Sequence, residues 1–205
     1  MYILEAYNTG DTDKLINFIE ENSFADLVTF HDGTLSSNKV PFFYDTEKNE
    51  LYGHFGRSNP QLIELENSNE VLVIFSGAHS YISPQWYISK NKVPTWNFQT
   101  LQVRGKASIV DDKELLRILA KLTKFHESKL ENQWTMSKLD PNSREKMLDM
   151  ITGFKVEITD IKFKEKMSQI RDVEDQKSII SALNKTNEPS AKKVANIMTE
   201  NIESE

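Results

Sequence analysis

Hydrophobic and polar positions along the chain follow two periods, one typical of helices and one typical of strands. Helical spacing or helix-start signals predict helices at 13–22, 60–67, 111–130, 140–152, 172–183 and 191–202. Alternating or continuous apolar runs predict strands at 26–31, 38–44, 50–56, 71–75, 98–110 and 154–158. Strands dominate the first half and helices lie between and after them, which favours an α+β fold with an antiparallel sheet or barrel.

Local signals set several boundaries of these elements. Asp32-Gly33 is typical of a tight turn between two strands. Pro41 predicts an edge or a bulge in the second strand, because proline cannot donate a ladder hydrogen bond. Asp111 with Glu114 predicts a capping box. Gly153 is expected to end the helix before the last strand.

Composition describes an ordinary globular domain without disulfides. The chain has 205 residues, of which 38% are hydrophobic and 27% charged, enough for one domain with its own core. It has no cysteine, which excludes disulfides and cysteine nucleophiles. The N-terminus lacks the pattern of a secretion signal, so we expect a cytoplasmic protein. We divide the chain into a domain at 1–183 and a linker with a C-terminal helical tail at 184–205.

The charge balance disfavours direct contact with nucleic acid. The formal net charge is −6, whereas a nucleic-acid site needs a basic face. Lys162, Lys164 and Lys166 alternate with Glu165 between the last two, and a solvated strand edge explains this pattern better than a DNA site.

Residues 53–60 combine a predicted strand, a glycine-containing turn and a helix start. Asn59-Pro60 fits a capping residue followed by proline at the first helical position. Free backbone N–H groups there, with the permanent charge of Arg57, favour a phosphate. The alternative is a capped helix beside a surface arginine.

Two further stretches are rich in aromatic residues. Residues 81–87 alternate aromatic and small polar side chains, which suits a flat heteroaromatic ligand or an aromatic corner of the core. Residues 93–97 add Trp96 and Asn97, at a ligand or in an ordinary turn before a strand. The histidines, in contrast, lack the spacing of a metal site, and we expect no bound metal; they are His31, His54, His79 and His126.

Together these stretches resemble the PaiB family of FMN-binding proteins. The runs GHFGRSNPQ, VLVIFSGAHSYISPQWY and VPTWNF occur in the family's order, followed by ITGFKVEI and KMSQIR. The similarity extends from Met1 to about Leu183. It implies a split β-barrel related to pyridoxamine phosphate oxidase, assembled as a homodimer with FMN in the dimer interface.

The resemblance also implies roles for individual residues. Arg57 would hold the FMN phosphate with Ser58, Asn59 and the helix start, and His54 would lie nearby. Aromatic and polar residues would line the isoalloxazine or the opposing wall, and an SQ pair would reach the flavin from the partner subunit. These residues are Tyr81, Ser83, Trp86, Tyr87, Trp96, Asn97, Ser168 and Gln169.

Two positions depart from the family pattern and affect the expected pocket. Lys39 stands where members often have a histidine, and Ile170 replaces the asparagine of an SQN motif. The resemblance implies a negative regulator of transcription that binds FMN. Two alternatives stay open. One is an FMN-dependent oxidoreductase acting on a small molecule with NAD(P)H, and the other is a haem-binding protein that uses a histidine ligand.

Overall fold

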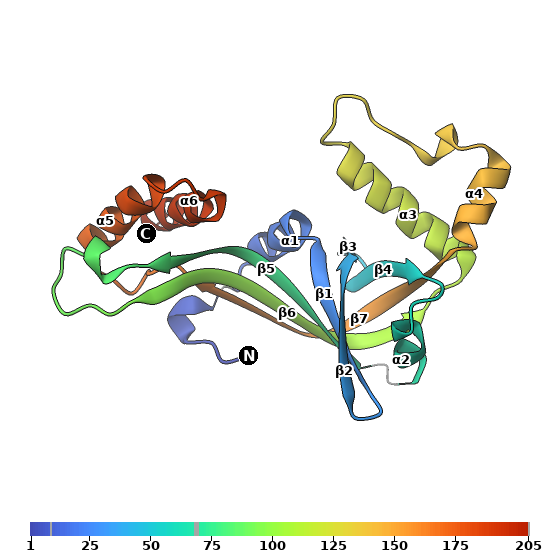
Figure 1. Cartoon of the computed structure of the whole chain (residues 1–205), viewed down its shortest axis with the longest axis horizontal. Helices are drawn as coiled ribbons and strands as arrows, with labels where there is room; N and C mark the ends of the chain where they lie inside the picture. Colours follow the sequence, from blue (N-terminus) through green and yellow to red (C-terminus); the bar gives the residue numbers. More distant parts are fainter. Residues whose placement is uncertain (9, 68–69, 205) are drawn as a thin grey trace. The chain divides into compact units, whose positions relative to one another are not determined.

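The chain forms a mixed α/β fold around one antiparallel sheet (Figure 1). The computed structural model describes residues 1–8, 10–67 and 70–204. Its helices are α1 (Thr12–Glu21), α2 (Gln61–Asn67), α3 (Asp112–Glu127), α4 (Pro141–Leu148), α5 (Val173–Asn184) and α6 (Pro189–Glu203). Its strands are β1 (Phe24–His31), β2 (Thr34–Pro41), β3 (Phe43–Asp45), β4 (Glu50–Gly56), β5 (Glu70–Ile82), β6 (Thr95–Ile109) and β7 (Ile151–Lys166).

In the described residues the strands lie in the order β2-β1-β5-β6-β7-β4-β3. The chain divides into two compact units, which we describe separately. Unit 1 comprises 1–15, 76–101 and 162–205, and unit 2 comprises 16–75 and 102–161. The strands β5, β6 and β7 contribute residues to both. Within the described chain, no helix has the length and apolar character needed to cross a membrane.

The β1–β2 hairpin of unit 2 follows its sequence signals. Asp32 and Gly33 have φ angles of 48° and 77°, the left-handed values that a two-residue hairpin turn of this kind requires. His31 pairs with Thr34 across that turn. β2 is an edge strand of the sheet and ends at Pro41, which confirms the predicted edge position.

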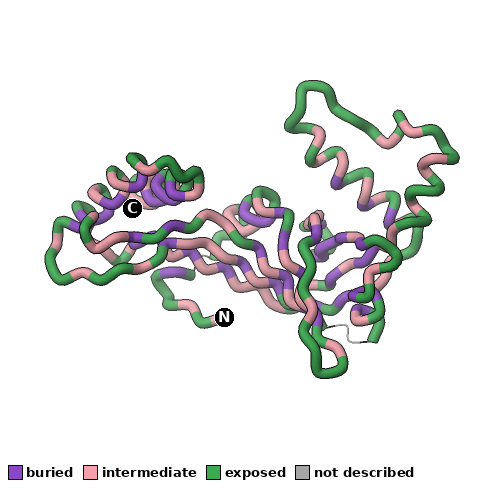
Figure 2. The backbone as a smooth tube through the Cα atoms, in the orientation of Figure 1, coloured by how far each residue is buried: buried purple, intermediate pink, exposed green. Residues whose placement is uncertain are grey.

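Aromatic rings fill the core of unit 2. The ring centroid of Phe42 lies 5.9 Å from that of Phe75 and 6.1 Å from that of Phe154. The centroids of Phe55 and Phe154 are 5.1 Å apart. α3 covers this unit with its apolar stripe, of which Ile118 is fully buried. Asp111 caps α3 by accepting a hydrogen bond from the Glu114 N–H at 2.8 Å, as predicted. Figure 2 shows buried residues in purple, recurring along the strands of the sheet.

α5 and α6 pack against each other in unit 1 around a separate core. Its buried members are Ile82, Tyr87, Met167, Ile179, Leu183, Ala191, Val194, Ala195 and Met198. α6 thus shares one core with Leu183, the last residue of the domain we delimit from the sequence. The boundary itself stays a prediction, and Glu205 lies outside the described residues.

Several boundaries predicted from the sequence are wrong. The helix predicted at 140–152 ends at Leu148, and β7 begins at Ile151. Gly153 is therefore a strand residue and not a helix end: a Cβ there would lie 2.8 Å from Val110 Cγ2, so close packing requires glycine. The strands predicted at 71–75 and 98–110 are longer than expected: β5 continues to Ile82 and β6 begins at Thr95.

Gly105 is the tightest backbone approach in unit 2, and it gives a stability prediction. A Cβ at Gly105 would lie 2.3 Å from the backbone oxygen of Glu157 on β7, which cannot move away as a flexible side chain can. We expect Gly105→Ala to lower the free energy of unfolding by roughly 3 kcal/mol. The control Gly10→Ala, at a site with open space, should change it by less than about 1 kcal/mol. Equal effects in urea unfolding would contradict the assignment.

Candidate functional site

The turn after β4 carries the residues that are predicted to bind a phosphate. Hydrogen bonds hold this turn against the start of β7. The Arg57 backbone N–H donates to the Met150 oxygen at 2.8 Å, and the Asn59 N–H donates to the Gly56 oxygen at 2.9 Å. The Arg57 guanidinium makes one long hydrogen bond, 3.4 Å, to the Ile151 oxygen. Arg57 and Ser58 are exposed, so most of the guanidinium donors face solvent.

α2 holds this turn in place through buried polar contacts. The Gln61 side chain is buried and donates to the Leu27 oxygen at 3.0 Å and to Thr29 Oγ1 at 2.9 Å. Asn59 caps the helix by accepting the Gln61 N–H at 2.9 Å. This cap confirms the predicted helix start, and it also occupies one of the backbone donors that the sequence assigned to phosphate.

His54 lies on β4 with an unpaired nitrogen. Its side chain is partly buried, and Nδ1 has no hydrogen-bond partner in the described part of the chain. Burial lowers its pKa below the ordinary value because water no longer stabilises the imidazolium. A neutral imidazole with a free nitrogen can accept or donate one hydrogen bond to a ligand.

The exposed aromatic residues of unit 1 gather around a cavity of about 550 Å³. Tyr81 on β5 and Trp96 on β6 meet edge to face, with ring centroids 6.0 Å apart and an interplanar angle of 72°. The His79 ring lies 6.3 Å from Trp96. The lining residues are His79, Ser80, Tyr81, Trp86, Trp96, Thr186, Asn187, Glu188, Ser190 and Ala191.

The other residues predicted in 81–87 have largely structural contacts. Ser83 accepts the Gln85 N–H at 3.2 Å and caps a short 3-10 helix at Pro84–Trp86. Tyr87 is buried, and its hydroxyl has no partner in the described residues. Its ring has Lys92 Nζ at 5.8 Å and Arg171 Cζ at 6.0 Å.

Asn97 and the SQ pair are bonded inside unit 1. Asn97 is fully buried, and its Oδ1 accepts the Ser168 hydroxyl at 3.0 Å. The Asn97 amide donates to Met198 Sδ at 3.4 Å. Gln169 accepts the Met167 N–H at 2.7 Å and donates to two backbone oxygens. These atoms serve the protein interior here, and their roles toward a ligand stay predictions.

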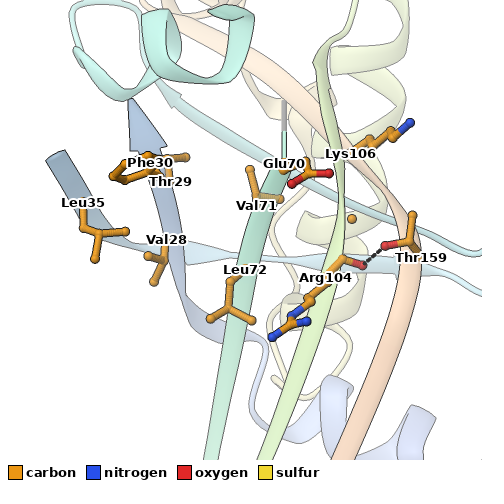
Figure 3. Close-up of a pocket in the computed structure, with 11 residues that line it drawn as sticks. Val28, Thr29, Phe30, Leu35, Glu70, Val71, Leu72, Arg104, Lys106 and Thr159 are labelled. Atoms are coloured by element: carbon orange, nitrogen blue, oxygen red, sulfur yellow. Dashed lines mark hydrogen bonds between the residues drawn. The ribbon is translucent and has the colours of Figure 1, made fainter. Parts of the chain in front are cut away.

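A second hollow, of about 430 Å³, lies on the sheet face of unit 2 (Figure 3). Apolar and polar side chains from several strands line it: Val28, Thr29, Phe30, Leu35, Glu70, Val71, Leu72, Arg104, Gly105, Lys106 and Thr159. Sequence reasoning missed this face. The alternation in β6 places Arg104 and Lys106 opposite the buried residues, but no local signal indicates which strands lie beside them.

The structure thus sorts the predicted site residues into two sets. His54, Arg57, Ser58 and Asn59 belong to unit 2. The set in unit 1 comprises Tyr81, Ser83, Trp86, Tyr87, Trp96, Asn97, Ser168 and Gln169. Each unit contains one of the two departures from the family pattern. In unit 2, Lys39 Nζ donates a hydrogen bond to Asp26 Oδ2 at 2.7 Å, and in unit 1 Ile170 is exposed.

Comparison with known proteins decides the family. A family model described as "Putative FMN-binding domain" matches residues 1–160. The chain belongs to this FMN-binding domain family. The chain is also 35% identical over 204 residues to "Protease synthase and sporulation protein PAI 2" of Bacillus subtilis, covering 98% of both chains. The resemblance to PaiB proteins is therefore confirmed.

Similar proteins also occur outside Bacillus subtilis. An uncharacterised protein of Emericella nidulans is 28% identical over 243 residues, covering 98% of this chain and 97% of its own. Among solved structures, the "FAD and Heme binding protein" of Mycobacterium smegmatis matches with a TM-score of 0.62 at 13% identity, covering 84% of this chain and 79% of that one. The "Flavocytochrome Anf3" of Azotobacter vinelandii matches at 0.61 and 12%, covering 82% and 74%. At such identities the likeness concerns the fold.

The partly buried imidazole of His54 gives a pH prediction. Its pKa is depressed by burial, so between the ordinary value of 6.5 and the lower folded value the unfolded chain binds more protons. The contribution of His54 to stability is therefore present above pH 6.5 and is lost as the pH falls through that window. Urea unfolding at pH 7.5 and 5.5 should show a smaller loss of stability in His54→Gln than in the unmodified protein. An equal loss would contradict the buried, neutral imidazole.

Proposed function

We propose that this protein is an FMN-binding split-barrel protein of the PaiB type that acts as a negative regulator of transcription. Membership of the FMN-binding domain family supports the cofactor. The observation that carries the proposal is the Arg57 turn, whose backbone is held by hydrogen bonds while the Arg57 guanidinium and the Ser58 hydroxyl are exposed beside each other in sequence. This is the donor set that a terminal phosphate monoester accepts, which favours FMN over flavins lacking such a group.

The residues present fit FMN in chemistry as well as in charge. Arg57 would bind phosphate oxygens through its planar fork, and Ser58 would donate one hydrogen bond. His54 Nδ1 would gain the hydrogen-bond partner that it lacks among the described residues. When bound, the flavin would supply hydride or electron transfer, while these side chains hold and orient it.

Haem is a second candidate, because a half-buried neutral histidine with a free nitrogen is a suitable axial ligand. The visible spectrum of the purified protein separates the two. Flavin bands, or flavin uptake on titration, support the proposal, and a Soret band that disappears in His54→Gln supports haem.

Charge reversal at Arg57 tests the phosphate assignment. We expect Arg57→Glu to weaken FMN binding by roughly 100-fold, because it removes charge-assisted hydrogen bonds and adds repulsion. Arg57→Lys should lose less FMN affinity than Arg57→Glu, because lysine keeps the positive charge. Arg144→Glu on α4 supplies the matched control and should bind as the unmodified protein does. Affinity is read from quenching of FMN fluorescence, and unchanged affinity in Arg57→Glu would refute the assignment.

A homodimer is part of the same proposal, and the hollowed sheet face of unit 2 suits a second copy. Phe30 and Leu35 are 53% and 70% exposed there, an apolar surface that a partner would cover. The face also carries Glu70 and Arg104, neither of which makes an ion pair in the described chain. In a two-fold interface each surface meets its own copy, so acidic and basic residues on one face can pair across it.

Leu35→Asp should shift the protein from dimer to monomer, since it places charge in the proposed interface. The exposed Leu35 contributes little to the monomer core, so folding should persist. Leu130→Asp, another exposed leucine of unit 2, is the control. Light scattering gives the mass of each. A native protein that is monomeric at all concentrations would rule out the dimer.

Regulation by this protein would act through a protein partner or through metabolism. The net charge of −6 opposes direct DNA contact. A cytoplasmic location belongs to the same proposal. A gel shift at physiological salt tests DNA binding: no shift is expected, and a sequence-specific shift would require a different account.

A further inference from the structure

We propose that the aromatic cavity of unit 1 is a binding site for a planar aromatic cation. The proposal goes beyond flavin binding: it gives Tyr81, Trp86 and Trp96 a ligand other than the flavin that the resemblance implies for them. The Arg57 turn, which carries the flavin proposal, belongs to unit 2 and supplies none of the residues that line this cavity. The cation proposal rests on the ring geometry, on the charge of the lining and on the way the cavity wall is fixed.

The rings form two walls at a steep angle. Trp96 is 52% exposed and Tyr81 is 44% exposed, although both are large aromatic side chains. Because the two ring planes are inclined at 72°, a flat ligand can stack on the face of one ring and contact the other ring at an angle. His79 and Tyr81 lie two residues apart on β5 and therefore on one face of the strand, which adds a third ring. Indole and phenol faces attract cations through their quadrupoles.

The charged residues that line the cavity favour a ligand of positive charge. The cavity is lined by no lysine or arginine, whereas Glu188 contributes a carboxylate. Within the described residues this carboxylate makes no ion pair or hydrogen bond, so it is free to face a ligand. An aromatic cavity with one acid favours a cation and disfavours an anion of the same shape.

The wall that carries Glu188 is fixed against β5. Ser190 accepts the His79 backbone N–H at 3.0 Å and donates its own hydroxyl to the His79 oxygen at 2.8 Å. These bonds hold the start of α6 beside the aromatic residues. The cavity is therefore formed before a ligand arrives, which lowers the entropic cost of binding.

Three ring compounds that differ in charge test the proposal on the full-length protein. The probes are 1-methylnicotinamide, nicotinamide and nicotinate, which share a six-membered ring and are cationic, neutral and anionic at pH 8. Calorimetry should give the tightest binding for the cation and the weakest for the anion. In NMR spectra the indole signals of Trp96 and Trp86 should shift, whereas that of Trp134, in unit 2, should not.

Variants assign the binding to the named residues. Trp96→Ala should weaken binding of the cation about fivefold or more. Because Trp96 is half exposed, the fold should persist in this variant. Glu188→Gln should lower the affinity for the cation several-fold and leave the affinity for neutral nicotinamide unchanged. Glu200→Gln, on α6 and outside the cavity lining, is the matched control and should change the affinity for neither probe.

The outcomes separate this proposal from flavin binding. Arg57→Glu should retain cation binding even though it loses FMN, so failure of one assignment leaves the other standing. Equal affinity for the three probes, preference for nicotinate, no saturable binding or an unchanged affinity in Glu188→Gln would overturn the cation site.

Discussion

The contact between β6 and β7 at Gly105 constrains the sheet of unit 2 more than any other approach we describe. The β7 backbone lies so close that no side chain fits at this position. On either side of Gly105, Val103 and Ala107 point into the core, while Arg104 and Lys106 face the hollow of Figure 3. The alternation of β6 therefore gives it a packed interior face and a polar, accessible face, and the glycine allows β7 to approach between them.

Buried polar contacts give the Arg57 turn its position. Gln61 donates to the backbone of β1 and to Thr29, and the Asn38 amide donates to Gln61 Oε1 at 2.9 Å. An unpaired amide at such depth would be costly, so each of these bonds restricts where α2 can lie. The exposed arginine is thus attached to a rigid base, and its side chain keeps the freedom to meet a ligand.

Sequence reasoning succeeded where the signal is local. The Asp32-Gly33 turn and the Asp111 cap depend on residues within three positions of each other, and both are confirmed. It failed at Gly153, whose requirement for glycine comes from Val110 and Leu115, distant in the chain. Of the site, the family resemblance supplied the residue names. It did not indicate that Asn97 bonds Ser168, 71 positions away, in the core.

The paired hydrogen bonds of Ser190 also affect how β5 meets other chains. β1 pairs with β5 at Leu72, Val73 and Ile74, so the part of β5 at His79 lies beyond that pairing. A strand edge of this kind normally presents an N–H and a carbonyl to any chain that can extend the sheet. At His79 both groups are already bonded to one hydroxyl. A side chain thus takes the place of a neighbouring strand at this residue, and the edge is closed there to aggregation by strand addition.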